Sequence, residues 1–534
     1  MLRGKERDPV RQVTKVFWIA LTVCVIFVAW GVVFPAALSE VMTDLQSFFL
    51  STFGWFYQLC ATFFLIFAAF LVFSRYGKIK LGKAEDKPDF NRLTWFALLF
   101  SAGMGIGLLF FGVSEPISHF ASPPLGEAKT GDAAKTAMRY TYLHWGLHAW
   151  AIYATIALAL AYFKFRKGYP GIMSAALIPL IGERRSRGAA GTAIDTVAVF
   201  ATIFGVAASL GLGAAQINGG LSYVAGIPNR FGIQLLIIGV VTVLFLLSAG
   251  TGLKRGITYL SNANMALASI LFFTVLIVGP TVFLLNLYIT TIGEYLQNLP
   301  SMGLRLAPFN PERAAWVQSW TIFYWAWWIA WAPFVGTFIA RVSRGRTVRE
   351  FVVAVTVIPT LVCTIWFAVF GGTALDLEYR LGVPISDKSL EIAIFYMYEH
   401  LPLRLGLVIV TLLLIATFFI TSADSATFVL GMQTTNGSLN PPTIVKTIWG
   451  LLLSASAVVL MLSGGLEAMQ TAIIVAAFPL AFVLILMAFS MLKSFKGELR
   501  PAGDAGKGGR GAEKASEERE GGFVFPKGHR EKAK

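Results

Sequence analysis

The chain has 534 residues, of which 56% are hydrophobic and only 14% are charged, with a formal net charge of +15. In soluble proteins roughly a quarter of all residues are charged. About 20 consecutive apolar residues are enough to cross a bilayer as a helix. The composition therefore excludes a soluble globular fold and predicts an all-α polytopic membrane protein. No helix-turn-helix, RRM or zinc pattern accompanies the positive charge, so no nucleic-acid partner is expected.

Long apolar runs predict twelve transmembrane helices. The expected spans are 16–34, 50–73, 93–114, 139–163, 193–224, 231–250, 258–285, 315–340, 350–371, 405–430, 443–462 and 466–492. Alternate connecting segments hold 35 of the 44 Lys and Arg residues. By the positive-inside rule, this predicts a multi-pass protein of the plasma (inner) membrane with both termini in the cytoplasm. A cleaved signal peptide in place of the first span is the alternative.

Two spans carry helix-weakening residues at matching places. The third span contains "SAGMGIGLLFFG", with Gly103, Gly105 and Gly107, and the eighth contains Pro333 in "WAPFVG". Interrupted helices at corresponding places of two halves are typical of transporter sites. The two spans are five apart, so the pattern predicts a 5+5 inverted repeat preceded by two extra helices. Close packing of helices is the other interpretation of the glycine cluster.

These spans define a predicted organisation of the chain. It comprises a cytoplasmic N-terminal segment (1–15), two additional transmembrane helices (16–92), a first five-helix repeat (93–285), an external amphipathic segment (286–314), a second five-helix repeat (315–492) and a polar cytoplasmic tail (493–534). The tail is glycine-rich and too polar to fold alone from Arg500 onward, so we expect it to be disordered.

Tryptophan is concentrated in "WTIFYWAWWIAW", residues 320–331, which hold five of the fourteen tryptophans. At 100° per residue, all of them except Trp325 share one helix face. The fourth span adds "HWGLHAWAIY", with Trp145, Trp150 and Tyr153. Aromatic rings around a cavity bind a quaternary ammonium by cation–π attraction, worth about 2 kcal/mol when desolvated. Helix packing or an interfacial aromatic belt is the alternative, although a belt occupies helix ends and these residues lie mid-span.

The chain resembles the betaine/choline/carnitine transporter (BCCT) family in "WTIFYWAWWIAWAPFVGTFIARVSRGRTVREF", "AGMGIG" and "HWGLHAWAIY". The resemblance extends over nearly the whole chain and implies a LeuT-like fold of ten core helices plus two, in a homotrimer embedded in the lipid bilayer. It is greatest to the sodium-coupled glycine betaine carriers. It also implies a substrate site with three parts. The aromatic box is matched here by Trp145, Trp150, Tyr153 and Trp328, and the glycines beside it by Gly103, Gly105 and Gly107. The path to the cytoplasm is matched by Phe323, Trp327 and Trp331.

The resemblance further implies Na⁺ as the coupling ion and no other cofactor. The stretch "FFITSADSATF" places two hydroxyl groups in the tenth span. The sodium site of the family matches Ser101, Met104, Phe418, Thr421 and Ser422. Hydroxyl groups in membrane helices often donate to their own backbone instead, which is the alternative interpretation.

A second sodium site stays open. Thr202 and Phe334 match positions that the family uses for it. Val206 stands where a Na⁺-coupled relative has threonine, and valine offers no side-chain oxygen.

The histidines do not indicate a metal centre. His144 and His148 lie four residues apart in the fourth span, but no further ligand stands out in the sequence. Helix packing is the favoured interpretation, and no catalytic constellation predicts an enzyme.

The sequence thus predicts a secondary active transporter that imports glycine betaine, or a similar quaternary ammonium osmolyte, with Na⁺ by alternating access, for osmoprotection. A sodium-independent carnitine/betaine exchanger, a proton-coupled choline transporter and an organic-cation channel are the alternatives. Choline carriers of the family resemble this glycine motif with Asp at the last glycine. We therefore expect the backbone around Gly107 to receive the carboxylate of betaine at an interrupted helix.

Overall fold

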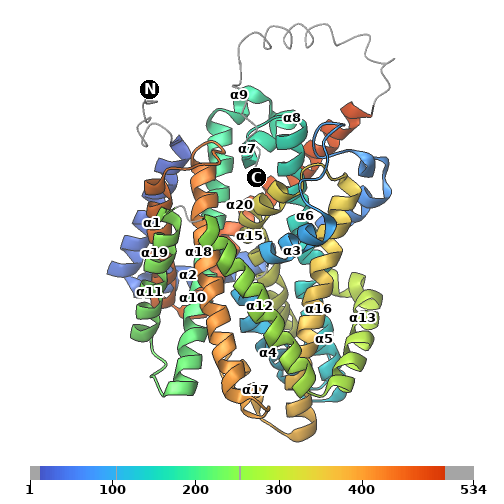
Figure 1. The fold of residues 1–534 in the computed structure, drawn as a ribbon, viewed down its shortest axis with the longest axis vertical. Helices are drawn as coiled ribbons and strands as arrows, with labels where there is room; N and C mark the ends of the chain where they lie inside the picture. The colour runs from blue at the N-terminus through green and yellow to red at the C-terminus, as the bar shows by residue number, and fades with distance from the viewer. Residues whose placement is uncertain (1–12, 104, 252–253, 500–534) are drawn as a thin grey trace, which may run out of the picture. The chain divides into compact units, whose positions relative to one another are not determined.

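The computed structural model describes residues 13–103, 105–251 and 254–499, and these form an almost entirely helical structure (Figure 1). The chain divides into Met1–Met491 and Leu492–Lys534. Most of the predicted tail, from Arg500, lies outside the described residues. Within these described ranges, eleven helical segments are long and apolar enough to cross a membrane, and α4 (Ile106–Ala121) is a shorter apolar helix. The predicted all-α polytopic membrane fold is confirmed.

The helices follow the predicted order of two, five and five. The first two are α1 (Lys15–Val33) and α2 (Pro35–Phe73). The first five segments are α3 (Arg92–Gly103) with α4, α5 (Gly131–Trp145) with α6 (Leu147–Ala161), α10 (Ala189–Ala225), α11 (Phe231–Thr251) and α12 (Lys254–Val278). The second five are α14 (Pro311–Val317) with α15 (Phe323–Val342), α16 (Val348–Leu381), α18 (Arg404–Thr434), α19 (Thr443–Leu462) and α20 (Gly465–Glu498).

Shorter elements connect these segments. They are η2 (Arg75–Lys78), η3 (Tyr162–Arg166), α7 (Met173–Ala176), α8 (Ile178–Ile181), α9 (Glu183–Ser186), η4 (Gln318–Ile322), η5 (Ile385–Asp387) and α17 (Ala393–Glu399). The longer α13 (Thr281–Gly303) separates the two sets of five and covers most of the segment that the sequence predicts to be an amphipathic helix.

The third span is interrupted as predicted, because α3 ends at Gly103 and the chain resumes helix at Ile106. The predicted interruption of the eighth span at Pro333 is wrong, since α15 runs through this residue without a break. Membrane helices tolerate proline where a hydroxyl side chain or a neighbouring helix compensates. Here α15 packs against α6, α10 and α3, and these neighbouring helices hold it in place. The irregular part of this span lies earlier, in the π-helical turn η4.

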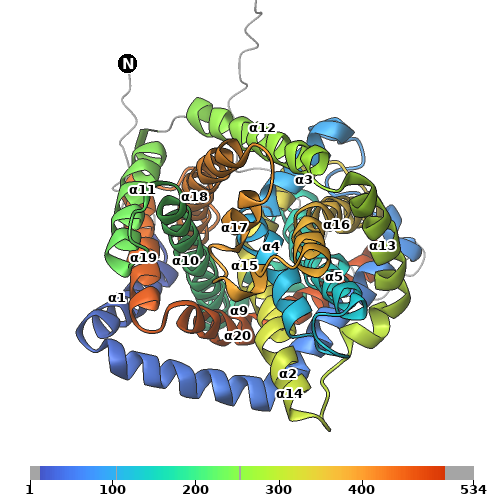
Figure 2. The ribbon, with the colours of Figure 1, turned by 90° about the horizontal axis from the view of Figure 1, so that it is seen from below.

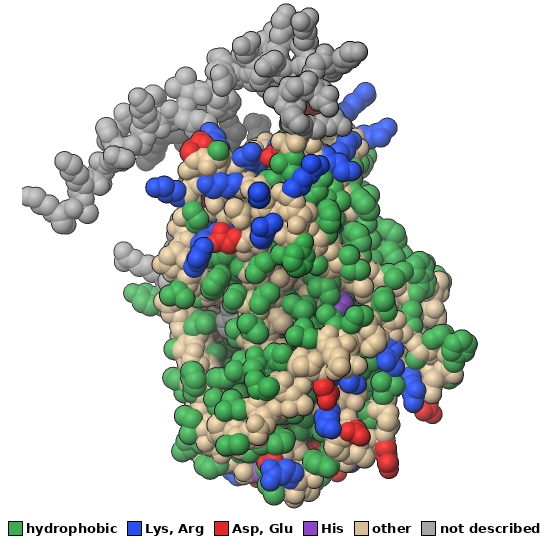
Figure 3. All heavy atoms as spheres, turned by 90° about the vertical axis from the view of Figure 1, so that its right-hand side faces the viewer, with side chains coloured by type: hydrophobic (Ala, Val, Ile, Leu, Met, Phe, Trp, Pro, Cys, Tyr) green, Lys and Arg blue, Asp and Glu red, His purple; other side chains and the backbone are tan. Residues whose placement is uncertain are grey.

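Within Met1–Met491, α15 lies inside the bundle, against α6, α10 and α3, while α11, α12 and α13 lie at its periphery (Figure 2). The apolar windows of α11 and α12 are only 22% and 17% buried. Hydrophobic side chains cover the middle of one face, and Lys and Arg gather towards one end of it (Figure 3). An exposed apolar band beside a basic end is the surface expected of a protein in a bilayer.

Two loops that the sequence places in the cytoplasm are bound to each other. Lys80 and Thr347 form an isolated antiparallel bridge. Nearby, Asp86 lies 3.0 Å from the Arg344 guanidinium and accepts a hydrogen bond from the backbone N–H of Lys83. This N–H and then the guanidinium lower the pKa of Asp86, because both stabilise its ionised form.

Candidate functional site

Helix α15 carries the tryptophan-rich segment through the interior of the fold. Every residue from Phe323 to Val335 is buried, as expected of a helix that is apolar on all sides. Trp325 points away from the other tryptophans, as predicted. Its Nε1 donates to Gln58 Oε1 of α2 at 2.9 Å, and its ring stacks on His148.

The structure brings together the four residues that match the aromatic box. The ring centroids of Trp145 and Trp328 are 5.1 Å apart, those of Tyr153 and Trp328 are 5.6 Å apart, and those of Trp150 and Tyr153 are 5.5 Å apart. The rings cross at angles of 80° to 89°. All four residues are buried, so α5, α6 and α15 enclose a wall of π faces and edges away from solvent.

A break in the fourth span places Trp145 and Trp150 at this wall. Helix α5 ends at Trp145, and α6 begins at Leu147. The residue between them, Gly146, has no room for a side chain, because a Cβ atom would lie 2.4 Å from the Tyr142 carbonyl oxygen. The sequence analysis did not predict this break, although the glycine in "HWGLH" was the available signal.

The glycine stretch lies directly against the box. Gly105 is extended at the start of α4, while Met104 lies outside the described residues. A Cβ on Gly107 would lie 2.8 Å from the Trp145 ring and 3.2 Å from the Trp327 ring. The structure thus gives Gly107 a packing role, because two indole rings occupy the space that a side chain would need.

The residues that match the transport path continue the aromatic face of α15. Phe323 stacks on Trp327 at 5.5 Å, and Trp327 meets Trp331 edge to face at 6.3 Å. Trp331 Nε1 donates to the Gly205 carbonyl oxygen of α10 at 2.7 Å. Trp327 Nε1 is buried and has no partner in the described part of the chain.

A buried carboxylate that was not predicted from the sequence lies next to the aromatic box, at the N–H edge of the Trp145 indole. Glu115 of α4 is 0% exposed. Its Oε2 accepts hydrogen bonds from Trp145 Nε1 at 2.7 Å and from the Tyr324 hydroxyl at 2.5 Å. Its Oε1 lies 2.7 Å from His144 Nδ1 and 3.2 Å from His119 Nε2.

The position of Glu115 explains why it was missed. The predicted third span ends at residue 114, whereas α4 continues to Ala121. An ionisable residue inside a span is a functional candidate by default, and a span extended by one turn would have included it. His144 is hydrogen-bonded to Glu115 and Thr321, which agrees with a packing role, but its ligand atom also lies within 4.8 Å of those of Glu115 and His119, a grouping that the sequence did not predict.

The described residues that match the first sodium site belong to two elements, the last turn of α3 and the middle of α18. An atom at the Cβ position of Gly105 would lie 3.7 Å from the Ser422 hydroxyl oxygen. The Thr421 hydroxyl donates to the Thr417 carbonyl oxygen at 2.9 Å and accepts from Asn264 Nδ2 at 3.2 Å. Thr421 thus shows the alternative back-bonded geometry, while Ser422 faces the break.

Other members of this set are described only in part. Ser101 lies in the last turn of α3, and its side chain is outside the described residues. Phe418 contributes a carbonyl oxygen that accepts from the Thr421 hydroxyl at 3.2 Å. Asn264 Oδ1 is buried and has no partner in the described part, so an oxygen is available beside Thr421 for a cation.

The second set fits a cation less well. The Thr202 hydroxyl donates to the Ala198 carbonyl oxygen within α10 at 2.8 Å. Phe334 of α15 packs edge to face against Trp331 at 5.5 Å. The buried Val206, one turn after Thr202, provides only hydrocarbon.

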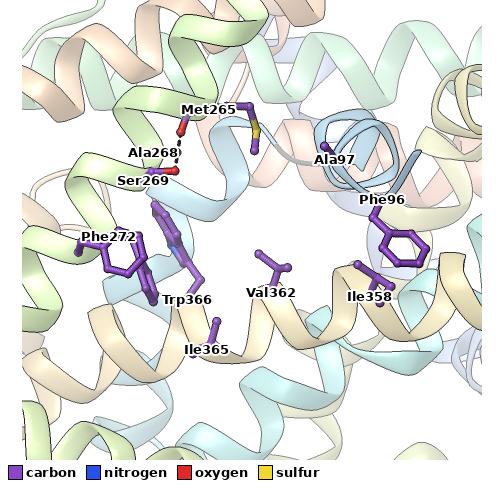
Figure 4. Close-up of a pocket in the computed structure, with 11 residues that line it drawn as sticks. Phe96, Ala97, Met265, Ala268, Ser269, Phe272, Ile358, Val362, Ile365 and Trp366 are labelled. Carbon is purple, nitrogen blue, oxygen red and sulfur yellow. Dashed lines mark hydrogen bonds between the residues drawn. The ribbon is translucent and has the colours of Figure 1, made fainter. Parts of the chain in front are cut away.

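A separate pocket of about 320 Å³ lies between α3, α12 and α16 (Figure 4). Its labelled lining includes Phe96, Met265, Ile358 and Trp366, and nearly all of it is apolar. The one hydroxyl group, of Ser269, donates to the Met265 carbonyl oxygen at 2.8 Å. The indole N–H of Trp366 donates to the Leu108 carbonyl oxygen at 3.1 Å, so neither polar group of this lining is left for a carboxylate, and the pocket does not suit a zwitterion.

The interrupted third span, the enclosed aromatic wall and the many membrane helices together define a membrane transporter. The profile described as "BCCT, betaine/carnitine/choline family transporter" matches residues 15–500. The chain belongs to this family, whose fold is LeuT-like, and is a transporter rather than an enzyme.

Curated relatives cover nearly the same length. The chain is 54% identical over 491 residues to the glycine betaine transporter OpuD of Bacillus subtilis (strain 168), across 92% of this chain and 96% of that protein. It is 44% identical to an ectoine/hydroxyectoine transporter of Virgibacillus pantothenticus, across 92% and 98%. It is also 44% identical to a probable glycine betaine transporter of Desulfitobacterium hafniense (strain Y51), across 90% and 97%.

Proposed function

We propose that this transporter imports glycine betaine, or a closely similar quaternary ammonium osmolyte, for osmoprotection. The observation that carries the proposal is the buried wall of Trp145, Trp150, Tyr153 and Trp328. A methylated ammonium has no N–H to donate, so π faces suit it better than hydrogen-bond acceptors do. The names of the relatives from Bacillus subtilis and Desulfitobacterium hafniense support the same substrate.

Two unpaired donors, one in the wall and one beside it, favour a substrate that also carries an anion. Trp327 Nε1 and the Tyr153 hydroxyl are buried and have no partner among the described residues. A buried donor without an acceptor is costly, and the carboxylate of betaine is a suitable acceptor. Choline offers only a neutral hydroxyl oxygen as acceptor, whereas betaine offers two charged carboxylate oxygens that form stronger hydrogen bonds, so a zwitterion is the better fit.

Coupling to Na⁺ is the second part of the proposal. Carbonyl groups at an interrupted membrane helix, together with nearby hydroxyl groups, coordinate Na⁺ in transporters of this architecture. The proximity of Ser422 to Gly105 and the unpartnered Oδ1 of Asn264 support such a site. When bound, the ion would tie α18 to the interrupted span next to the box, and this would link ion binding to substrate binding in an alternating-access cycle.

The setting of the molecule completes the proposal. The basic loops support a topology in which both termini lie in the cytoplasm and the protein lies in the plasma membrane. Helix α13 exposes Val282, Leu285, Ile289 and Leu296. These apolar side chains provide a surface for the subunits of a homotrimer, and chemical cross-linking in native membranes would test this arrangement.

Counterflow in reconstituted vesicles tests the substrate. Vesicles loaded with unlabelled betaine, choline, carnitine, proline or ectoine are diluted into labelled betaine, with Na⁺ or K⁺ outside. We expect exchange with betaine and with similar methylated zwitterions in Na⁺ only. Equal exchange in K⁺ would identify a sodium-independent exchanger, and downhill flux without exchange would identify a channel. No entry of labelled betaine, together with entry of labelled choline into choline-loaded vesicles, would identify a choline carrier.

A further inference from the structure

The hydrogen bonds of Glu115 indicate that its carboxylate is ionised. The indole N–H of Trp145 can only donate, so Oε2 accepts. His144 Nδ1 lies 2.7 Å from Oε1 and donates to it when it carries the ring proton, and His144 Nε2 lies 2.9 Å from the hydroxyl of Thr321. His119 with its proton on Nε2 leaves Nδ1 bare, and Nδ1 has no partner in the described part. A protonated His119 would instead bury an unpaired donor.

No Lys or Arg side chain in the described part of the chain neutralises this charge. Within the described residues, Glu115 forms ion-pair contacts with His119 and His144 but with no Lys or Arg. A buried charge that lacks a counter-ion is expensive in a membrane protein. The four donors around Glu115 hold the charge in place, but they do not explain why a charge is there.

We propose that Glu115 is the counter-charge of the aromatic box and acts through Trp145, an inference that rests on the proposed function. A carboxylate that accepts the indole N–H increases the electron density of the ring, and the face of that ring attracts the cation. The interior has a low dielectric constant, so the charge also acts across the ring without touching the substrate. A carboxylate inside the box would repel the carboxylate of betaine, whereas one behind the indole avoids this contact. Glu115 is thus a positioning and specificity-determining residue.

The test compares two ligands of one shape. Betaine and its tert-butyl analogue differ only in that carbon replaces the quaternary nitrogen. Glu115→Gln keeps an oxygen for the Trp145 N–H but removes the charge, so betaine affinity should fall at least about tenfold and analogue affinity less than about threefold. The control is Glu378→Gln, which changes another buried carboxylate, one that accepts from the Ser386 backbone N–H at 2.8 Å. We expect this control to leave both affinities unchanged.

A second pair of variants tests the same link if Glu115→Gln does not fold. Trp145→Phe keeps a ring but loses the N–H that binds Glu115, while Trp150→Phe removes an indole whose N–H is bonded to Cys363 instead. The preference for betaine over the analogue should fall further in Trp145→Phe. Equal losses in these two variants, or an unchanged preference in folded Glu115→Gln, would overturn the counter-charge. A parent protein that does not prefer betaine would instead overturn the proposed function.

Discussion

Replacing Trp328 with leucine removes the π face at the centre of the aromatic wall. Trp328 meets both Trp145 and Tyr153 edge to face, and its Nε1 donates to the His144 carbonyl oxygen at 2.8 Å. One desolvated cation–π contact is worth about 2 kcal/mol, which corresponds to roughly a thirtyfold loss of betaine affinity. The unpaired carbonyl oxygen costs a further ~1–3 kcal/mol, but this cost falls on folding stability.

Equilibrium binding to purified protein separates the two effects. Labelled betaine and its tert-butyl analogue are measured on the parent, on Trp328→Leu and on Trp328→Phe, which loses the same hydrogen bond but keeps a ring. Trp328→Leu should lose far more affinity for betaine than for the analogue, and Trp328→Phe should retain much of the preference. Equal losses for both ligands in Trp328→Leu would show that the wall recognises shape alone.

Three further predictions concern the ion site, the glycine stretch and the loop contact. Changing both Thr421 and Ser422 to Ala should raise the Na⁺ concentration for half-maximal uptake at least about threefold, and an unchanged value would show that the ion binds elsewhere. The family resemblance predicts that Gly107→Asp admits choline, and the new side chain should also push the indoles of Trp145 and Trp327 apart, so betaine uptake should fall. The control Gly232→Ala should have no effect, because no other atom lies within 4 Å of the added Cβ. The pKa of Asp86 in the folded protein lies below its ordinary value of 3.8, so the Asp86–Arg344 ion pair stabilises the fold above pH 3.8. This stabilisation is lost as the pH falls through the folded-state pKa. Thermal unfolding should therefore show that Asp86→Asn is less stable than the parent at pH 7 and equally stable in strong acid.

The sequence predicts the spans well where apolar runs are continuous. The predicted span 443–462 coincides with α19. Helix α2 begins at Pro35, well before the predicted residue 50. The prediction started too late because Glu40 and Asp44 interrupt the apolar pattern of this helix. The breaks were harder to predict, since glycine and proline act through their neighbours. Gly146 ends a helix against Tyr142, whereas the effect of Pro333 is absorbed by the packed surroundings of α15.

The site was predictable where a compact motif carries it. Trp145 and Trp328 lie in two motifs that are recognisable from their tryptophan content. The structure places the rings of these two residues in contact. Glu115 could not be assigned to them, because its partners lie 30 and 209 residues away in the chain. Only the packing of α4 against α5 shows that its carboxylate faces an indole N–H.

Concentrative uptake tests the central claim most directly. The purified protein is reconstituted into vesicles, and labelled glycine betaine is supplied outside with an inward Na⁺ gradient or with K⁺ in its place. We predict that betaine accumulates above its external concentration with the Na⁺ gradient and that the accumulation collapses when the gradient is dissipated. Equal accumulation in K⁺, or none above equilibrium in Na⁺, would contradict this prediction.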